Sequence, residues 1–140
     1  MLQKFKEHIN INFPFLKDKK LLIAISGGLD SVVLTHLFHQ LNNAEIALAH
    51  CNFKLRDEES DLDEEFVINL SQKTSNQIFT INFNTKKIAE QRKTSTQITA
   101  RELRYNWLNA IVKKHDFDFV LTAHHADDNL ETFLINLTRG

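Results

Sequence analysis

The sequence predicts an α/β fold in which a doubly wound parallel sheet carries helices on both faces. Three observations predict it: short runs of continuous apolar residues, intervening segments whose apolar residues recur every three or four positions, and a regular alternation of the two. Strands covered on both faces have apolar runs of this kind, and parallel neighbours are joined by helical crossovers. With 140 residues and no Pro/Gly-rich linker, the chain is expected to form one domain over residues 1–140.

Four strand-helix units follow an opening helix. Leu2, Phe5 and Ile9 have the spacing of an amphipathic helix that ends near Pro14. Each later helix is predicted from a single apolar face. The strands are predicted at residues 21–25, 46–49, 78–83 and 119–121, and the helices that follow them at 33–41, 62–70, 100–111 and 130–137.

The composition indicates a soluble cytoplasmic protein. Hydrophobic residues make up 42% of the chain and charged residues 25%, with a net charge of −1, which excludes a disordered chain and does not by itself indicate nucleic acid binding. A local basic patch remains compatible with that balance. Cys51 is the one cysteine, which excludes an internal disulfide and fits a reducing compartment. No apolar stretch approaches the ~20 residues of a membrane span, so no membrane contact is expected.

A glycine loop follows the first predicted strand and opens the first crossover helix. Its sequence is Ser26-Gly27-Gly28-Leu29-Asp30-Ser31. Glycine lets the backbone approach a ligand closely, and a helix N-terminus offers unpaired N–H groups to an anion, so phosphate is the expected guest. The loop has neither the lysine of a P-loop nor the spacing of a dinucleotide-binding turn. The alternative is a tight turn in which Asp30 or Ser31 caps the helix.

The string SGGxDS resembles the pyrophosphate loop of the PP-loop ATP pyrophosphatase superfamily. The resemblance implies an adenine nucleotide alpha hydrolase-like (HUP-type) fold and cleavage of ATP between its α and β phosphates. It also implies that Asp30 acts in catalysis and helps to place Mg²⁺. The remaining nucleotide-binding positions that it implies are Ser26, Gly27, Gly28, Leu29 and Ser31.

A charged segment, residues 50–61, follows the second predicted strand. On its own it is a solvated loop, and Ser60 with Asp63 reads as a capping box for the next helix. Its order resembles the H-x-N-H-x-L-R-x-E-S-x-x-D-E-x-F segment of the tRNA(Ile)-lysidine synthetase family. The chain has Phe53-Lys54 where that pattern carries His-Gly. The resemblance implies a place near the nucleotide for His50.

The third crossover helix begins with Thr99-Ala100-Arg101-Glu102-Leu103-Arg104-Tyr105. Arginines on a helix are usually surface residues. The segment resembles the A-R-x-x-R-Y signature of the same family, whose first arginine is thought to meet the ATP phosphates. Because guanidinium suits bidentate contact with phosphate, Arg101 takes this nucleotide-binding and catalytic role by resemblance.

A polar segment, residues 122–132, follows the fourth predicted strand. Asp128 and Glu131 form a plausible capping pair, and two adjacent histidines do not make a zinc site. A carboxylate at this strand end would instead face Asp30 across the switch point of the sheet, where both could hold Mg²⁺. The string resembles the T-A-x-H-x-D-D-x-x-E-T-x-L block of the family. The resemblance implies phosphate or charge support by His125, metal or amine contact by Asp128, and lysine contact by Asp128 and Glu131.

These resemblances imply a ligase that uses ATP and Mg²⁺, with tRNA(Ile) bearing a CAU anticodon and L-lysine as its substrates. The implied reaction adenylates C2 of the wobble cytidine and then joins lysine to form lysidine, releasing AMP and pyrophosphate. The chain would be a partial N-terminal PP-loop ATP-binding domain, ending after the fourth unit. An uncovered sheet edge would favour self-association, for example as a homodimer. The alternatives are another PP-loop tRNA-modifying enzyme, a thiolase or amidotransferase, and a nucleotide-binding fragment without turnover.

Overall fold

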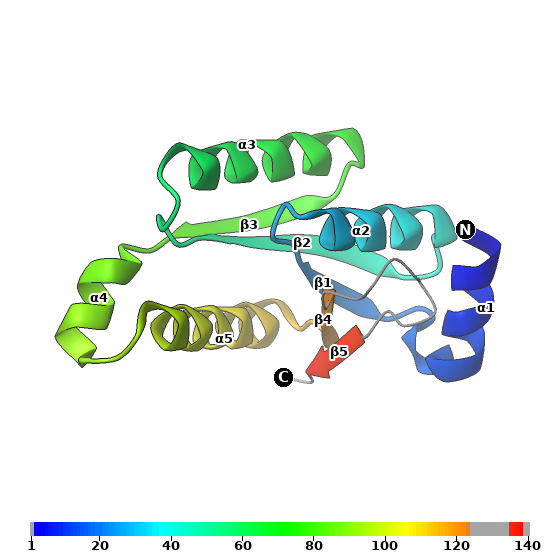
Figure 1. The fold of residues 1–140 in the computed structure, drawn as a ribbon. Helices are drawn as coiled ribbons and strands as arrows, with labels where there is room; N and C mark the ends of the chain where they lie inside the picture. The colour runs from blue at the N-terminus through cyan, green and yellow to red at the C-terminus, as the bar shows by residue number, and fades with distance from the viewer. Residues whose placement is uncertain (1, 124–134, 139–140) are drawn as a thin grey trace.

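The computed structural model describes residues 2–123 and 135–138 and contains one five-stranded sheet in the order β3-β2-β1-β4-β5 (Figure 1). The first four strands pair in parallel, as predicted, and β5 pairs antiparallel with β4. The strands are β1 (Lys20–Ala24), β2 (Glu45–Asn52), β3 (Gln77–Asn82), β4 (Phe119–Ala123) and β5 (Ile135–Thr138). The helices are α1 (Leu2–Asn12), a short 3-10 turn η1 (Pro14–Leu16), α2 (Leu29–Leu41), α3 (Glu58–Lys73), α4 (Thr85–Arg92) and α5 (Thr96–His115).

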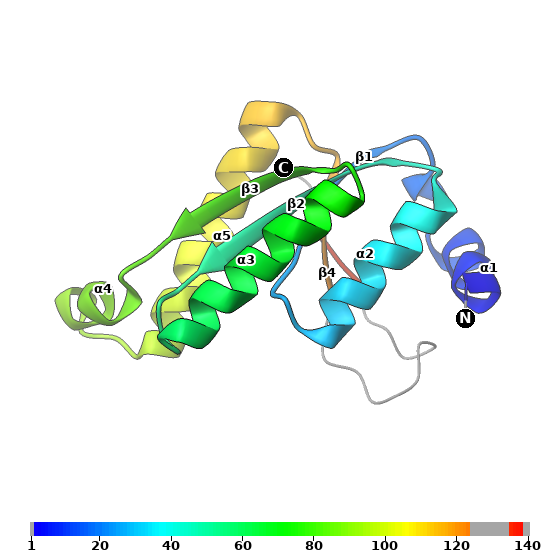
Figure 2. The ribbon, with the colours of Figure 1, turned by 90° about the horizontal axis from the view of Figure 1, so that it is seen from above.

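Helices cover both faces of the sheet, which confirms the doubly wound architecture. Helices α2 and α3 lie over one face and α5 lies over the other, with α4 beyond the carboxyl end of β3 (Figures 1 and 2). Strand β1 pairs with β2 on one side and with β4 on the other. The switch point of the sheet, where ligands bind in open α/β folds, therefore lies at the carboxyl end of β1.

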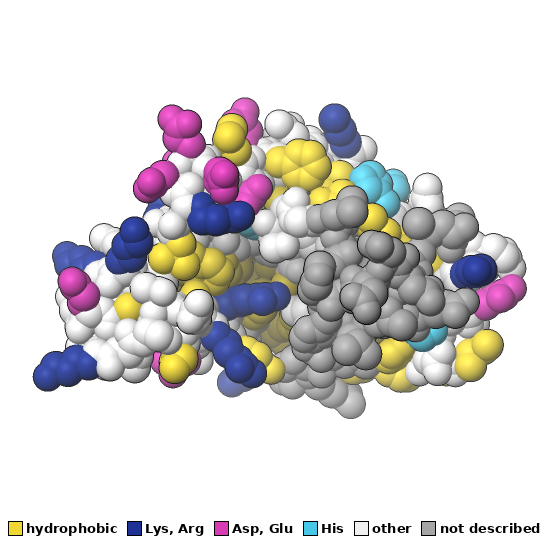
Figure 3. Space-filling model, viewed as in Figure 1, with side chains coloured by type: hydrophobic (Ala, Val, Ile, Leu, Met, Phe, Trp, Pro, Cys, Tyr) yellow, Lys and Arg dark blue, Asp and Glu magenta, His cyan; other side chains and the backbone are white. Residues whose placement is uncertain are grey.

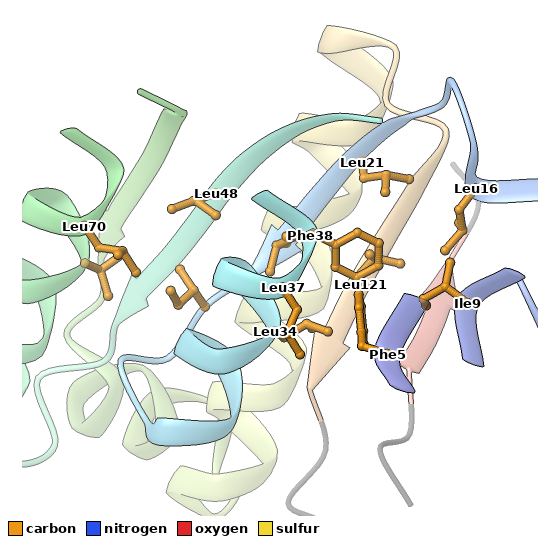
Figure 4. Packing of buried hydrophobic residues seen from close by; sticks show 13 residues of the cluster. Phe5, Ile9, Leu16, Leu21, Leu34, Leu37, Phe38, Leu48, Leu70 and Leu121 are labelled. Atoms are coloured by element: carbon orange, nitrogen blue, oxygen red, sulfur yellow. The ribbon is translucent and has the colours of Figure 1, made fainter. Parts of the chain in front are cut away.

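The core has two parts because successive side chains of β1 point to opposite faces. Leu21, Ile23 and Ile25 pack with α1, α2 and α3, and Phe5 of α1 meets Phe38 of α2 edge-on at 5.1 Å between ring centroids (Figure 4). Leu22 and Ala24 pack instead with α5. Burial of each large apolar side chain contributes about 1.5–3 kcal/mol, so β1 is fixed from both sides. The strand end that precedes the glycine loop is therefore rigid.

Three elements differ from the prediction: α4, β2 and β5. Helix α4 was not predicted, because its sequence has only Ile88 and Ala89 to mark an apolar face. Strand β2 continues through Asn52, so His50 and Cys51 belong to the strand and not to the following loop. Their hydrogen bonds to β3 keep the chain extended there, since Asn52 is in register with Asn82.

The predicted helix at 130–137 is wrong in its described part. Residues Ile135 to Thr138 form β5, with Leu137 opposite Leu121 of β4. The segment Ile-Asn-Leu-Thr alternates apolar and polar residues and contains two β-branched side chains, a pattern that favours a strand. Residues 130–134 lie outside the described part of the chain.

Candidate functional site

The glycine loop is held by a closed set of hydrogen bonds between its two serines and its own backbone. Ser31 Oγ donates to Gly28 O (3.0 Å) and accepts from Ser26 N (3.2 Å). Because that hydroxyl has one proton, Ser26 Oγ is left to donate to Ser31 Oγ (3.2 Å), and it accepts from Gly28 N (3.2 Å). Ser31 is buried, so its hydroxyl shapes the loop.

Gly27 is required at its position for two reasons. Its φ is +92°, in the region that L side chains rarely adopt, and a Cβ added there would lie 3.3 Å from Cβ of Asp63 on α3. Gly28 has an ordinary φ of −73° and caps α2, whose first N–H groups have no partner within the helix. The loop therefore presents backbone donors at a helix N-terminus, as an anion site needs.

Asp63 links the glycine loop to an arginine. Its Oδ2 accepts from Nη2 of Arg56 at 2.6 Å, and the other nitrogen of that guanidinium lies 3.7 Å from Glu59. The Arg56 side chain is 63% exposed, so the ion pair itself adds little to stability. Its effect is positional: a guanidinium with free donors stands beside the glycine loop.

His50 is buried beneath this loop and has one unpartnered nitrogen. Its Nδ1 lies 2.8 Å from Ile25 O, and a carbonyl only accepts, so Nδ1 carries the proton. Its Nε2 is buried without a hydrogen-bond partner. In the neutral imidazole that nitrogen is an acceptor, and an unsatisfied buried acceptor costs about 1–3 kcal/mol.

A cavity of about 330 Å³ opens at the carboxyl ends of β1 and β2, next to the glycine loop. Figure 3 shows the hollow between α3 and α5, with apolar side chains inside it and basic ones at its edge. The polar wall comes from β2, the following loop and α3. The lining residues are Ala24, Ile25, Ser26, Ala49, His50, Cys51, Asn52, Phe53, Leu55, Arg56, Ser60, Asp63, Arg104 and Leu108.

The wall formed by α5 is apolar except for one arginine. Ala24, Ala49 and Leu108 belong to the core cluster on this face of the sheet. Burial raises the pKa of the Cys51 thiol to about 12, against a smaller opposing effect of the Arg104 guanidinium. Cys51 is therefore a neutral, weakly reactive group in the floor of the cavity.

The rim over the cavity is organised by the buried amide of Asn52. It donates to Asp61 Oδ1 (2.9 Å) and Glu64 Oε2 (3.1 Å) of α3, and its Oδ1 accepts from Lys54 N (3.0 Å). Lys54 Nζ reaches Asp61 at 2.5 Å. Hydrogen bonds from Lys54 and then Asn52 lower the pKa of the Asp61 carboxyl.

Lys54 stands where the family pattern has glycine, in a backbone conformation that favours glycine. Its φ is +54°, the left-handed conformation that glycine adopts without strain.

The predicted capping box at Ser60 is wrong, because α3 begins earlier, at Glu58. Ser60 lies in its first turn, where its Oγ accepts from Arg56 N at 3.1 Å.

The predicted site residues are only partly brought together in the described part of the chain. Ser26 and His50 line the cavity, whereas Arg101 is exposed and absent from the lining, where Arg104 stands instead. The side chain of Asp30 and all of His125, Asp128 and Glu131 lie outside the description. Sequence reasoning missed Asn52, Asp63 and Arg104. Arg104 had a signal, since it shares a helical face with the buried Leu108 four residues on, and Asn52 matches the asparagine of the family pattern.

Among the described residues, no group of three His, Cys, Asp or Glu side chains is placed to hold a metal ion. The Mg²⁺ site predicted at Asp30 and Asp128 depends on side chains beyond that description and stays a prediction. In the same part of the chain, no helix has the length and apolarity needed to cross a membrane.

A rigid strand end, a glycine loop at a helix N-terminus and an adjoining cavity together define a nucleotide-binding α/β domain. The chain belongs to the PP-loop domain family, whose model matches residues 1–140. It therefore has the ATP-binding loop that this family shares.

Curated relatives make the comparison more specific. The chain is 45% identical to a tRNA(Ile)-lysidine synthase of Bacteroides thetaiotaomicron over 96% of its own length and 30% of that protein. It is 36% identical to one of Chlorobaculum tepidum, with 99% of this chain and 43% of the relative covered. A Bacillus subtilis protein of the same name is 31% identical, with 99% and 30% covered. The chain thus spans less than half of each of these relatives.

Proposed function

We propose that this chain is the ATP-binding part of a ligase that modifies tRNA(Ile), adenylating C2 of the wobble cytidine in its CAU anticodon and joining lysine to form lysidine. The observation that carries the proposal is the continuity of the glycine loop with the cavity, because Ser26 belongs to both. Donors for phosphates therefore adjoin a hollow with an apolar wall, as a nucleotide requires. The names of the relatives supply the RNA substrate and the product.

Different parts of the site would bind different parts of ATP. The backbone at Gly27 and the first turn of α2 would hold the terminal phosphates, and the apolar wall would hold the nucleoside. Arg101, predicted to contact phosphate, and Arg104, in the cavity, are the two candidate cations of α5. Asp30 and Asp128 would hold Mg²⁺, which neutralises charge on the departing pyrophosphate.

The remaining assignments concern the polar segment after β4. His125 would support charge on the phosphates, Asp128 would contact the attacking amine, and Glu131 would help to hold L-lysine. A carboxylate within hydrogen-bond reach of the amine can accept its proton. Asp128→Asn with unchanged lysine transfer, measured from an already adenylated RNA, would exclude that role.

A homodimer in the cytoplasm is part of the proposal. Leu62 and Phe66 lie one turn apart on α3 and are 61% and 49% exposed, and neighbouring exposed apolar side chains favour self-association. Light scattering coupled to size-exclusion chromatography measures the mass directly. A monomeric mass at high protein concentration would exclude the homodimer and leave the rest of the proposed function unaffected.

ATP–pyrophosphate exchange tests the adenylation step. In the whole protein, exchange is expected only in the presence of tRNA(Ile) with a CAU anticodon, and Asp30→Ala should abolish it. Exchange that another tRNA supports equally well would favour a different PP-loop tRNA-modifying enzyme. ATP binding without any exchange would indicate a nucleotide-binding module. A thiolase that uses Cys51 is disfavoured already, because burial keeps this thiol protonated.

A further inference from the structure

The net charge of −1 conceals two oppositely charged regions. Residues 85–105, which form α4 and the start of α5, contain only two acidic residues, Glu90 and Glu102. The same segment contains six basic residues: Lys86, Lys87, Arg92, Lys93, Arg101 and Arg104. Helix α3 carries the reverse balance, with one basic residue, Lys73, and six acidic ones: Glu58, Glu59, Asp61, Asp63, Glu64 and Glu65. Figure 3 shows the acidic group over α3 and the basic group over α4 and beside the hollow.

The turn between α4 and α5 is held in place by side-chain interactions. Ser95 caps α5 by accepting from Ile98 N at 3.1 Å, and the hydroxyls of Thr94 and Thr99 lie 2.7 Å apart. Arg92 also bridges the two helices through Glu102 at 3.3 Å. The basic side chains therefore stand on a fixed support.

The N-terminal end of α4 adjoins the candidate site through a pair of aromatic rings. Phe53 lines the cavity and stacks on Phe83 with 6.0 Å between centroids and 18° between planes. Phe83 directly precedes Asn84, the N-cap residue of α4. A ligand lying on α4 would thus reach the cavity without crossing α3.

An exposed aromatic side chain extends the same surface along α5. Tyr105 is 51% exposed. It is the next residue in the sequence after Arg104, which lines the cavity. Ile98 is 52% exposed and lies two turns earlier on the same helical face. Basic side chains beside an exposed aromatic ring are the combination that single-stranded nucleic acids use, because phosphates pair with the charges and a base stacks on the ring.

We propose that this surface docks a single-stranded segment of RNA and leads its target base into the cavity. We name it the basic corner and define it as Lys86, Lys87, Arg92, Lys93 and Tyr105. Its four charges lie along α4 and at the C-cap of that helix, and its aromatic ring lies on α5, a spread that exceeds what one mononucleotide can contact. The acidic helix α3 would repel the RNA backbone from the opposite rim and so fix the direction of approach. The inference rests on the proposed RNA substrate.

The test measures RNA binding by the whole protein at several salt concentrations. The probe is a fluorescent anticodon stem-loop of tRNA(Ile) with CAU, followed by anisotropy. The variant pair is Lys86→Ala with Lys87→Ala, and the matched control is Lys113→Ala with Lys114→Ala. The control lysines are exposed and lie at the C-terminal end of α5, near the amino-terminal end of β1, where His115 O accepts from Lys20 Nζ at 2.5 Å.

The basic-corner pair should weaken binding about tenfold at 0.1 M salt and lower the slope of log affinity against log salt by about 1.4, since each lost phosphate contact contributes about 0.7 for single strands. Tyr105→Ala should weaken binding about tenfold without changing the slope, and Tyr105→Phe should retain affinity. ATP binding, measured alongside, should not change in any of these variants.

Equal losses in the lysine pair and its control would overturn the basic corner while leaving the proposed function intact. Displacement of the RNA by polyglutamate as effectively as by unlabelled RNA would also overturn it, in favour of an acidic peptide. A wild-type protein that binds no RNA would instead remove the proposed function itself.

Discussion

The two walls of the cavity differ in chemistry although both are built on the same pair of strands. The wall that faces α3 is polar, with Asn52, Asp63 and His50 tied to backbone or charged partners. The wall that faces α5 is apolar apart from Arg104. Successive residues of β2 point to opposite faces, so His50 and Cys51 sit on different walls. The end of β2 thereby presents a hydrogen-bonded imidazole to one wall and a protonated thiol to the other.

The largest effect that tests this contrast concerns Cys51. A pKa near 12 instead of 9 leaves roughly a thousandfold less thiolate at pH 8, so alkylation by iodoacetamide should be slower by that order than in urea. Mass spectrometry follows the reaction at the one cysteine of the chain. ATP should slow it further if the nucleoside lies against this wall.

The raised pKa of the Cys51 thiol also determines the direction in which the stability of the fold changes with pH. The folded-state pKa lies above the unfolded one, so the contribution of the thiol to stability is complete below pH 9 and is lost as the pH rises toward 12. A Cys51→Ala variant should lose less stability over that interval. Native alkylation at the urea rate would contradict a buried thiol and, with it, the apolar character of the wall.

The second prediction concerns the single charge of the apolar wall. Arg104→Met should raise the KM for ATP about tenfold to a hundredfold, the value of a charge-assisted hydrogen bond in a partly desolvated site. Arg101→Met is the matched variant one turn earlier on the same helix. A larger rise of the KM in Arg101→Met than in Arg104→Met would support the resemblance-based assignment of Arg101.

The third prediction tests the polar wall at the glycine loop. Gly27→Ala should destabilise the fold by about 1–3 kcal/mol, because its φ of +92° is strained for alanine and Asp63 occupies the space. Gly28→Ala, with an ordinary φ and only the movable Ser26 hydroxyl nearby, should cost less. Thermal unfolding and ATP titration measure both. Adding Asp63→Ala removes the contacts with Cγ and Oδ1 but keeps Cβ at 3.3 Å, so it should relieve only part of the loss, and full recovery would contradict a strained φ.

The smallest expected effect separates the two nitrogens of His50. In His50→Asn the amide nitrogen can replace Nδ1 and keep the bond to Ile25 O, whereas His50→Gln loses it and should cost about 0.5–1.5 kcal/mol more in unfolding free energy. If a hydroxyl or amino group of ATP donates to Nε2, His50→Asn should weaken ATP binding while the protein remains folded. Unchanged ATP affinity in His50→Asn would restrict this histidine to a structural role.

Much of the fold was predictable because it depends on local patterns. The continuous apolar residues of β1 and the glycine loop after it predict the parallel α/β fold and a candidate site at the end of this strand. The sequence pattern does not predict α4, because this helix covers little apolar surface, and it favours helix over β5 because Leu137 also fits a helical spacing.

The site was less predictable because its geometry depends on tertiary contacts. The approach of Asp63 to Gly27 joins a helix to a loop distant in sequence, and no local pattern announces it. The choice between Arg101 and Arg104 depends on the rotation of α5 about its axis, which the surrounding core residues determine. Asn52 resembles any polar residue at a strand end until its two acidic partners on α3 are known.

The contact between Gly27 and Asp63 also has a consequence for how the sequence can diverge. Since the carboxylate side chain fills the space that a Cβ at position 27 would need, the two positions are constrained as one unit. A bulkier residue at 63 would press on the loop, and a smaller one would release both the loop and the Arg56 guanidinium. Viable descendants of this chain should therefore change position 63 only together with a neighbour that restores its volume and its charge.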